Sequence, residues 1–159
     1  MEIIDTFLSR PNWVPERIEK QFEKFYPMLN DLGFNPRTIG TNVVPISSPF
    51  EDVVQLMKQC RCTIVLGLPQ ISVEKGRVKG VVIEKGFTLP TEWNQIEAAI
   101  SIMLNKPTLM MLHSGVATNG LFDRGAANVF VHKFHTLGHK WIEEMEPKLE
   151  ALRNRVLAR

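Results

Sequence analysis

Apolar and polar residues alternate along this chain with two different periods, and each period predicts a different kind of element. Between Pro15 and Gly33, apolar residues recur every three or four positions, with charged residues between them. That spacing is typical of an amphipathic helix, and a glycine is a suitable residue to end it. The same period predicts further helices from about Pro49, from Thr91 and over about residues 139–158.

Short apolar runs separate these helices and indicate strands. The run from Cys62 to Leu66 is continuous and rich in β-branched residues, as expected for a parallel strand that is covered on both faces. Strands that alternate with helices predict a flavodoxin-like α/β fold of three layers, with a five-stranded parallel sheet in the order 2-1-3-4-5. The expected strands are Ile3–Leu8, Phe34–Ile39, Cys62–Leu66, Thr108–Leu112 and Asn128–His132.

The segment at about 70–89 interrupts this alternation. Its apolar positions alternate with Arg77 and Lys79, and glycines divide it. We interpret it as a hairpin-like insertion, because a connection of this length is unusual between a strand and a helix. It is either a lid or an interaction flap within a single domain that spans residues 1–159.

Composition predicts a cytoplasmic globular protein. The chain has 159 residues, of which 44% are hydrophobic and 23% charged, enough for one domain with its own core. The net charge of +2 is scattered, whereas a nucleic-acid-binding protein normally carries a basic patch. Cys60 and Cys62 have no partners for a zinc or disulfide framework, so we expect no metal site. We also expect no membrane span and no signal peptide.

Candidate binding residues follow from the expected sheet. Ligands of open parallel sheets bind outside the carboxyl ends of the strands. The helix that begins at Thr91 starts on the same edge, and a long loop follows the fourth strand. The candidate substrate-binding residues at these places are Ser9, Arg10, Thr41, Asn42, Pro69, Gln70, Trp93, His113 and Asp123.

Glu97 is the candidate catalytic residue. It lies four positions after Trp93 and therefore on the same face of the helix. The residues around it are apolar on almost every side, which predicts a buried helix. A carboxylate in such a helix must be paired, exposed in a cleft, or used in chemistry. The non-catalytic interpretation is a capping or salt-bridged acid.

Two stretches resemble known families. The first strand, Asp5-Thr6-Phe7-Leu8-Ser9, is similar to the opening pattern of Toll/interleukin-1 receptor (TIR) domains, and residues 91–97, TEWNQIE, resemble their segment Ser-x-Trp-Cys-x-x-Glu. Residues 97–107 resemble the stretch of the nucleoside 2-deoxyribosyltransferases in which the nucleophilic Glu precedes Ala-x-Ala-x-Gly-Lys-Pro. Both resemblances imply that Glu97 is catalytic. They extend in element order over roughly residues 3–113.

The resemblance implies cleavage of an N-glycosidic bond, with NAD as the expected substrate and no cofactor required. Nicotinamide leaves NAD as a neutral molecule, so one carboxylate beside the ribose could suffice. Removal of a neutral base would also need a proton donor, for which Glu92, Asp123 and His113 are candidates. Trp93 could stack on a ring, and Arg10 could bind a phosphate.

Three alternatives remain open. The chain could be a nucleotide sensor without turnover, a self-association module of the TIR type, or a deoxyribosyltransferase or nucleotide base hydrolase. The Asp that the deoxyribosyltransferases usually carry after the third strand is absent here, where the chain reads Gly67-Leu68-Pro69-Gln70. That departure favours hydrolysis over base exchange. The TIR resemblance further implies a homo-oligomer and a role in prokaryotic defence or signalling.

Overall fold

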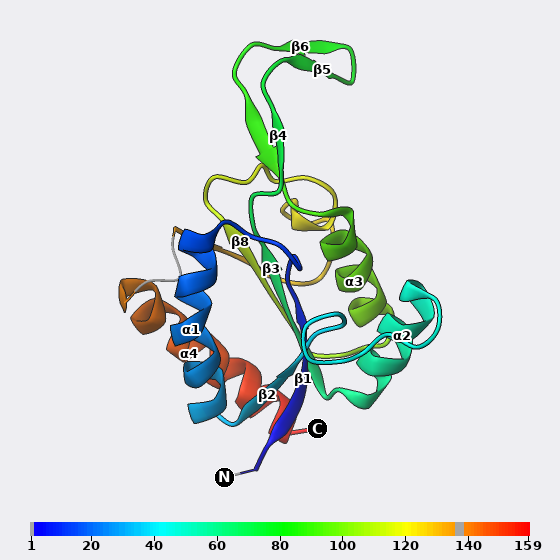
Figure 1. The fold of residues 1–159 in the computed structure, drawn as a ribbon, viewed down its shortest axis with the longest axis vertical. Helices are drawn as coiled ribbons and strands as arrows, with labels where there is room; N and C mark the ends of the chain where they lie inside the picture. The colour runs from blue at the N-terminus through cyan, green and yellow to red at the C-terminus, as the bar shows by residue number, and fades with distance from the viewer. Residues whose placement is uncertain (1, 136–138) are drawn as a thin grey trace.

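A five-stranded parallel sheet forms the centre of the protein (Figure 1). The computed structural model describes residues 2–135 and 139–159. The strands lie in the order β2-β1-β3-β8-β9, which confirms the predicted 2-1-3-4-5 arrangement. Their bounds are β1 Ile4–Ser9, β2 Phe34–Arg37, β3 Cys62–Gly67, β8 Thr108–His113 and β9 Val131–Phe134.

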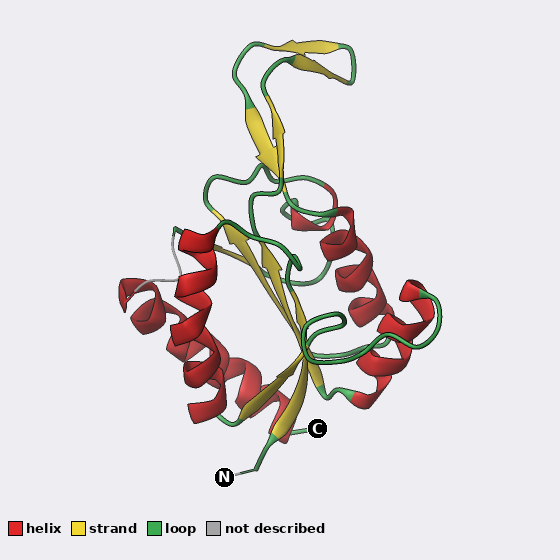
Figure 2. Cartoon of the chain, in the orientation of Figure 1, coloured by secondary structure: helices red, strands yellow, loops and turns green. Residues whose placement is uncertain are grey.

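Helices cover both faces of this sheet and complete the three layers (Figure 2). Helices α1 (Glu16–Asp31) and α4 (His139–Leu157) pack on one face, and α2 (Pro49–Gln59) and α3 (Glu92–Met103) pack on the other. Alternate strand residues serve the two layers, because successive side chains of a strand point to opposite faces. In β1, Ile4 and Leu8 contact the α1 and α4 layer, while Phe7 packs against α2.

Two strand boundaries and one burial prediction were wrong. The second strand ends at Arg37, because the backbone N–H groups of residues 41–43 turn back to the carbonyl of Thr38. The fifth strand begins at Val131, three residues later than predicted, where pairing with β8 starts. Helix α3 is not buried all round, since Met103 is 86% exposed. Only one side of α3 meets the sheet, and that side carries Asn94, Ala98 and Ser101.

Basic side chains cap the carboxyl ends of three helices at the edge where the strands begin. Lys106 Nζ donates to the carbonyls of Lys58 and Cys60 after α2, at 3.1 and 2.6 Å. Arg61 donates to Val156 O in the last turn of α4. Arg159 donates to Asn105 O just beyond α3. These contacts place positive charge against the negative ends of the helix dipoles.

An arm projects from the opposite edge, between β3 and α3 (Figure 1). It consists of residues 71–89 and contains two short antiparallel pairs, β4 (Ile71–Val73) with β7 (Phe87–Leu89) and β5 (Gly76–Val78) with β6 (Val81–Ile83). Lys79 and Gly80 join β5 to β6, and both have positive φ angles, as a two-residue type I′ turn requires. Among the helices described, none is long and apolar enough to cross a membrane.

Candidate active site

A cleft of about 470 Å³ opens at the carboxyl ends of β1 and β2, between the amino-terminal ends of α2 and α3. Its walls come from the loops after β1 and β2 and from the two helices. The lining residues are Arg10, Pro11, Asn12, Thr38, Ile39, Gly40, Pro45, Pro49, Val53, Thr91, Trp93 and Glu97. The volume lies within the range of small-molecule sites, and most of the wall is apolar.

Glu97 lines this cleft from the second turn of α3 and is half-buried. Burial raises the pKa of its carboxyl group from 4.5 to about 7, because removal of water penalises the charged form. A hydrogen bond from Ser9 opposes that effect by stabilising the carboxylate. A pKa near neutrality is typical of residues at functional sites, where burial and specific partners shift the protonation of a group.

The Ser9 hydroxyl is oriented toward Glu97 by a short chain of buried hydrogen bonds. Thr91 is the N-cap of α3, and its Oγ1 accepts from Asn94 N and donates to Asn94 Oδ1 at 3.0 Å. The Asn94 amide therefore turns its Nδ2 toward Ser9 Oγ, to which it donates at 2.8 Å. Because the serine oxygen accepts this bond, its own proton is available to Glu97. Ser9 and Asn94 are each only 1% exposed.

Asn94 belongs to this site although sequence reasoning did not select it. It lies three residues after Thr91 and three before Glu97, so all three share a helical face. A polar residue at that spacing in an otherwise apolar helix could have identified Asn94 as a site residue from the sequence. A buried asparagine needs partners for its amide, and here the helix cap and Ser9 supply them.

Arg10 lies beside Ser9 in the sequence, but its guanidinium contacts the other face of the sheet. It forms an ion pair with Glu19 at 2.8 Å, donates to Tyr26 Oη at 3.2 Å, and lies 4.0 Å from the centre of the Phe22 ring. The side chain is thereby held within the α1 layer. This geometry does not support the predicted role of Arg10 as a phosphate ligand.

His113 also lies on the α1 side of the sheet. It lines a separate pocket with Arg17, Leu68 and Phe134, and its Nδ1 accepts from Gly115 N at 3.0 Å. Burial lowers the pKa of its imidazole. His113 is the second residue predicted for the site that faces away from Glu97.

Of the other predicted residues, Trp93 lines the cleft and is 39% exposed, and two lie on the loop after β2. Asn42 holds the loop after β2 through Thr38 N and Pro36 O, and Thr41 is exposed beside it. The remaining three lie elsewhere: Pro69 and Gln70 at the root of the arm, and exposed Asp123 after the 3₁₀ helix η1 (Gly120–Phe122).

Among the described residues that line the cleft, the ionisable ones are Glu97 and Arg10, and the guanidinium of Arg10 is paired with Glu19. Within residues 2–135 and 139–159, no group of three His, Cys, Asp or Glu side chains is placed to hold a metal ion. The chemical resources of the cleft are one carboxylate near its pKa, an exposed indole and the amino-terminal ends of two helices.

Comparison with known proteins supports the fold. No protein-family model matches the chain, and no curated protein matches it in sequence. Among solved structures it is similar to the Clostridium botulinum CMP N-glycosidase BcmB, with a TM-score of 0.59 and 14% identity over 90% of this chain and 98% of that chain. At this identity the similarity shows a shared fold. The resemblance to TIR domains stays a prediction.

The raised pKa of Glu97 predicts a specific pH dependence of stability. The folded protein holds a proton on Glu97 that the unfolded chain releases above pH 4.5, so the free energy of unfolding falls as pH rises from about 4.5 to 7. Glu97→Gln removes this loss and should stabilise the protein above pH 7 by up to about 3 kcal/mol relative to wild type. Urea unfolding between pH 4.5 and 8 measures the difference. Glu92→Gln, at an exposed position of the same helix, should keep the wild-type pH profile. If the free energy of unfolding has the same pH dependence in wild type and in Glu97→Gln, the pKa of Glu97 is not raised.

The hydrogen-bond chain predicts a second effect. Ser9→Ala removes the donor that stabilises the Glu97 carboxylate, so the pKa of Glu97 should rise above its wild-type value. An NMR titration of the glutamate side-chain carboxyl carbons measures this pKa directly. Ser101→Ala is the matched control, because it also deletes a buried serine hydroxyl, one that lies on α3 and bonds Thr108 at 2.7 Å. A pKa that is unchanged in Ser9→Ala would show that the serine proton points elsewhere.

Proposed function

We propose that this protein hydrolyses the N-glycosidic bond of a nucleotide and that Glu97 is its catalytic residue. The observation that carries the proposal is a single half-buried carboxylate, oriented by Ser9, at the wall of a largely apolar cleft. The fold shared with a CMP N-glycosidase is consistent with this chemistry.

The reaction needs stabilisation of positive charge on the sugar. As the bond to the base breaks, its electron pair leaves with the base, and the ribose carbon gains oxocarbenium character. The Glu97 carboxylate stabilises that charge or forms a transient ester with the carbon. Water then adds to the carbon and loses a proton to the solvent, and where an ester has formed its carbon–oxygen bond breaks and restores the Glu97 carboxylate. Partial burial strengthens the attraction, because the local dielectric constant is lower than that of water.

NAD, cleaved between nicotinamide and ribose, is the substrate that we propose first. Its nicotinamide carries a positive charge before cleavage and leaves neutral, so no proton donor is needed. This matches the described lining of the cleft, in which Glu97 is ionisable and Arg10 is paired with Glu19. The exposed indole of Trp93 offers a surface for ring stacking. CMP is the second candidate because of the structural neighbour, although release of cytosine would require protonation of the base.

The test is release of the base from NAD and from CMP, measured by chromatography. Wild type should release nicotinamide, and Glu97→Gln should reduce kcat/KM by roughly a thousandfold, the upper range for loss of one charge-stabilising group. Glu92→Gln serves as the control, and its kcat/KM should stay near the wild-type value. Ligand-induced thermal shifts without base release would indicate a nucleotide sensor. If the protein neither binds these nucleotides nor releases a base, both roles are ruled out.

The pH dependence of the reaction tests the protonation state of Glu97. If the ionised carboxylate acts, kcat/KM for NAD rises with pH and levels off above the pKa of about 7. In Ser9→Ala the midpoint should move to higher pH, since the carboxylate loses its donor. A rate that instead falls through this range would show that the protonated acid is the active form.

A further inference from the structure

Exposed apolar side chains gather on two surfaces of the molecule. Of the thirteen large hydrophobic residues that are exposed in the described part of the chain, ten lie on the arm or in the segments that form the cleft. On the arm these are Ile71, Val78, Val81 and Val82. At the cleft, Trp93 is a lining residue, and five others are sequence neighbours of lining residues: Trp13, Val44, Ile46, Phe50 and Ile96. Concentrated exposure of this kind marks interaction surfaces.

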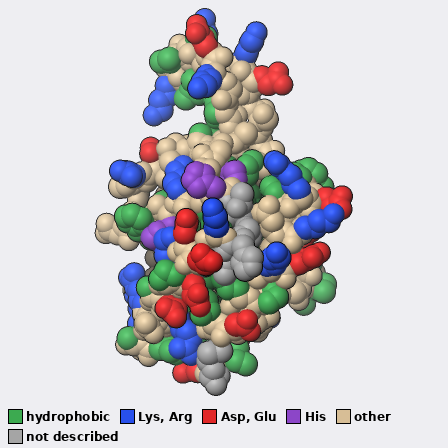
Figure 3. Space-filling model, turned by 90° about the vertical axis from the view of Figure 1, so that its left-hand side faces the viewer, with side chains coloured by type: hydrophobic (Ala, Val, Ile, Leu, Met, Phe, Trp, Pro, Cys, Tyr) green, Lys and Arg blue, Asp and Glu red, His purple; other side chains and the backbone are tan. Residues whose placement is uncertain are grey.

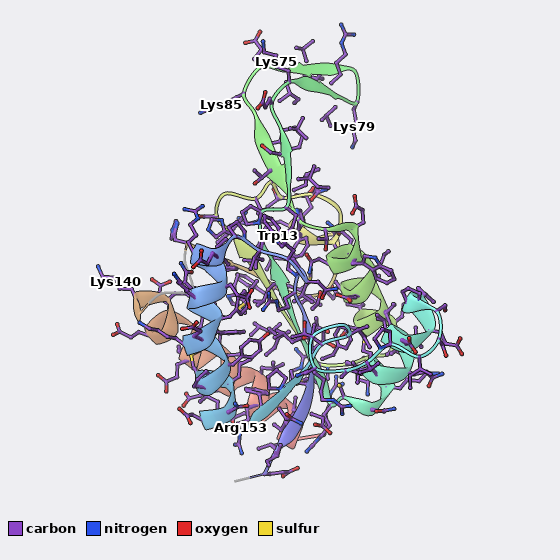
Figure 4. The ribbon with its side chains drawn as sticks, in the orientation of Figure 1. Trp13, Lys75, Lys79, Lys85, Lys140 and Arg153 are labelled. Atoms are coloured by element: carbon purple, nitrogen blue, oxygen red, sulfur yellow. The ribbon has the colours of Figure 1, made fainter. Side chains whose placement is uncertain are left out.

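The rim of the cleft consists of residues 11–14, 38–53 and 91–97, which supply its lining or flank it. These segments contain four carboxylates, those of Glu51, Asp52, Glu92 and Glu97, and no lysine or arginine. Arg10 also lines the cleft, but its charge is paired with Glu19. Trp13, 70% exposed, lies on the loop that leads from β1 to α1 (Figure 4). The rim is therefore apolar and acidic.

The arm carries the opposite charge. It contains Lys75, Arg77, Lys79 and Lys85 against two glutamates, a net charge of +2 in 19 residues. Basic side chains project around its tip (Figures 3 and 4). Apart from its root, the arm extends away from the rest of the molecule (Figure 1). The apolar and basic surface of its tip thus has no counterpart within the same chain.

An isolated pair of two strands is only marginally stable in water, so contact with a partner would stabilise the tip of the arm. Two arms facing each other would bring like charges together. The rim of a second copy offers apolar side chains and the opposite charge. In a two-fold dimer each chain both gives an arm and receives one, so both surfaces are covered at once.

We propose that this protein forms a reciprocal dimer in which the arm of each chain docks on the cleft rim of the other. The valines of β5 and β6 pack against the apolar side chains of the rim, and the arm lysines lie beside Glu51 and Glu92. This assignment concerns the partner of the cleft and stands independently of the reaction proposed for it.

Charge reversal of the arm tests the proposal. Size-exclusion chromatography with light scattering, over a dilution series of the full chain, should show a dimer that dissociates to monomer. The combined variant Lys75→Glu, Lys79→Glu, Lys85→Glu should raise the dissociation constant at least about tenfold, because both docking contacts become repulsive. A control that reverses three exposed lysines elsewhere, Lys24→Glu, Lys58→Glu, Lys140→Glu, should stay dimeric.

Charge reversal of the rim distinguishes this mode from contact between two arms. Glu51→Lys with Glu92→Lys should also weaken the dimer, whereas pairing of arm with arm would leave this variant unchanged. An equimolar mixture of the arm variant and the rim variant should recover the wild-type dissociation constant, since both contacts are again attractive.

Three results would overturn the proposal: a wild-type chain that stays monomeric at all concentrations, a rim variant that dimerises normally, or a mixture that fails to associate. Circular dichroism spectra matching wild type would show that the variants are folded. Association is measured without substrate, so failure of the dimer and failure of the proposed reaction are separate outcomes.

Discussion

The alternation of side chains along β1 is the constraint on which the site depends. Ser9 and Arg10 are consecutive, so in an extended strand they must face opposite layers. Ser9 reaches α3 and bonds Asn94 and Glu97, while Arg10 reaches α1 and bonds Glu19. A one-residue shift of register would exchange these partners and bury the guanidinium beside the apolar face of α3. The pairing of β1 with β2 and β3 therefore places the serine whose hydrogen bond counters the effect of burial on the pKa of Glu97.

The parallel arrangement also gives the two edges of the sheet opposite electrostatic character. Amino-terminal helix ends meet at the cleft edge, where Thr91 caps α3 and Ser48 caps α2. Carboxyl-terminal ends meet at the other edge, where Lys106, Arg61 and Arg159 satisfy their carbonyls. The basic residues at that edge thus have structural partners. The backbone N–H groups at these helix ends favour an anionic group of a ligand, although the basic residue in the described lining of the cleft, Arg10, is paired with Glu19.

Much of the fold and the central residue of the site could be predicted from the sequence. Apolar periodicity located the helices and the strand order, and the Thr91 cap and Glu97 spacing placed a carboxylate at the correct edge. His113 and Arg10 were assigned by edge alone, without the alternation of their strands, which places both on the α1 layer. The cleft walls at Asn12, Thr38 and Pro45 come from loops, whose conformations depend on tertiary contacts that no local pattern encodes.

The arm leads directly into α3, and hydrogen bonds hold its root to neighbouring segments. Leu89 accepts from Gln70 N, while Thr88 bonds Gly115 and Ala117 on the loop after β8. These contacts anchor the root at two places before the chain reaches the Thr91 cap. Movement of the tip on docking would therefore be absorbed within the arm, whose strands are joined by turns at each end. A partner's arm could then cover the cleft while the hydrogen bonds from Thr91 to Glu97 stay intact, so docking would change access to Glu97 rather than its orientation.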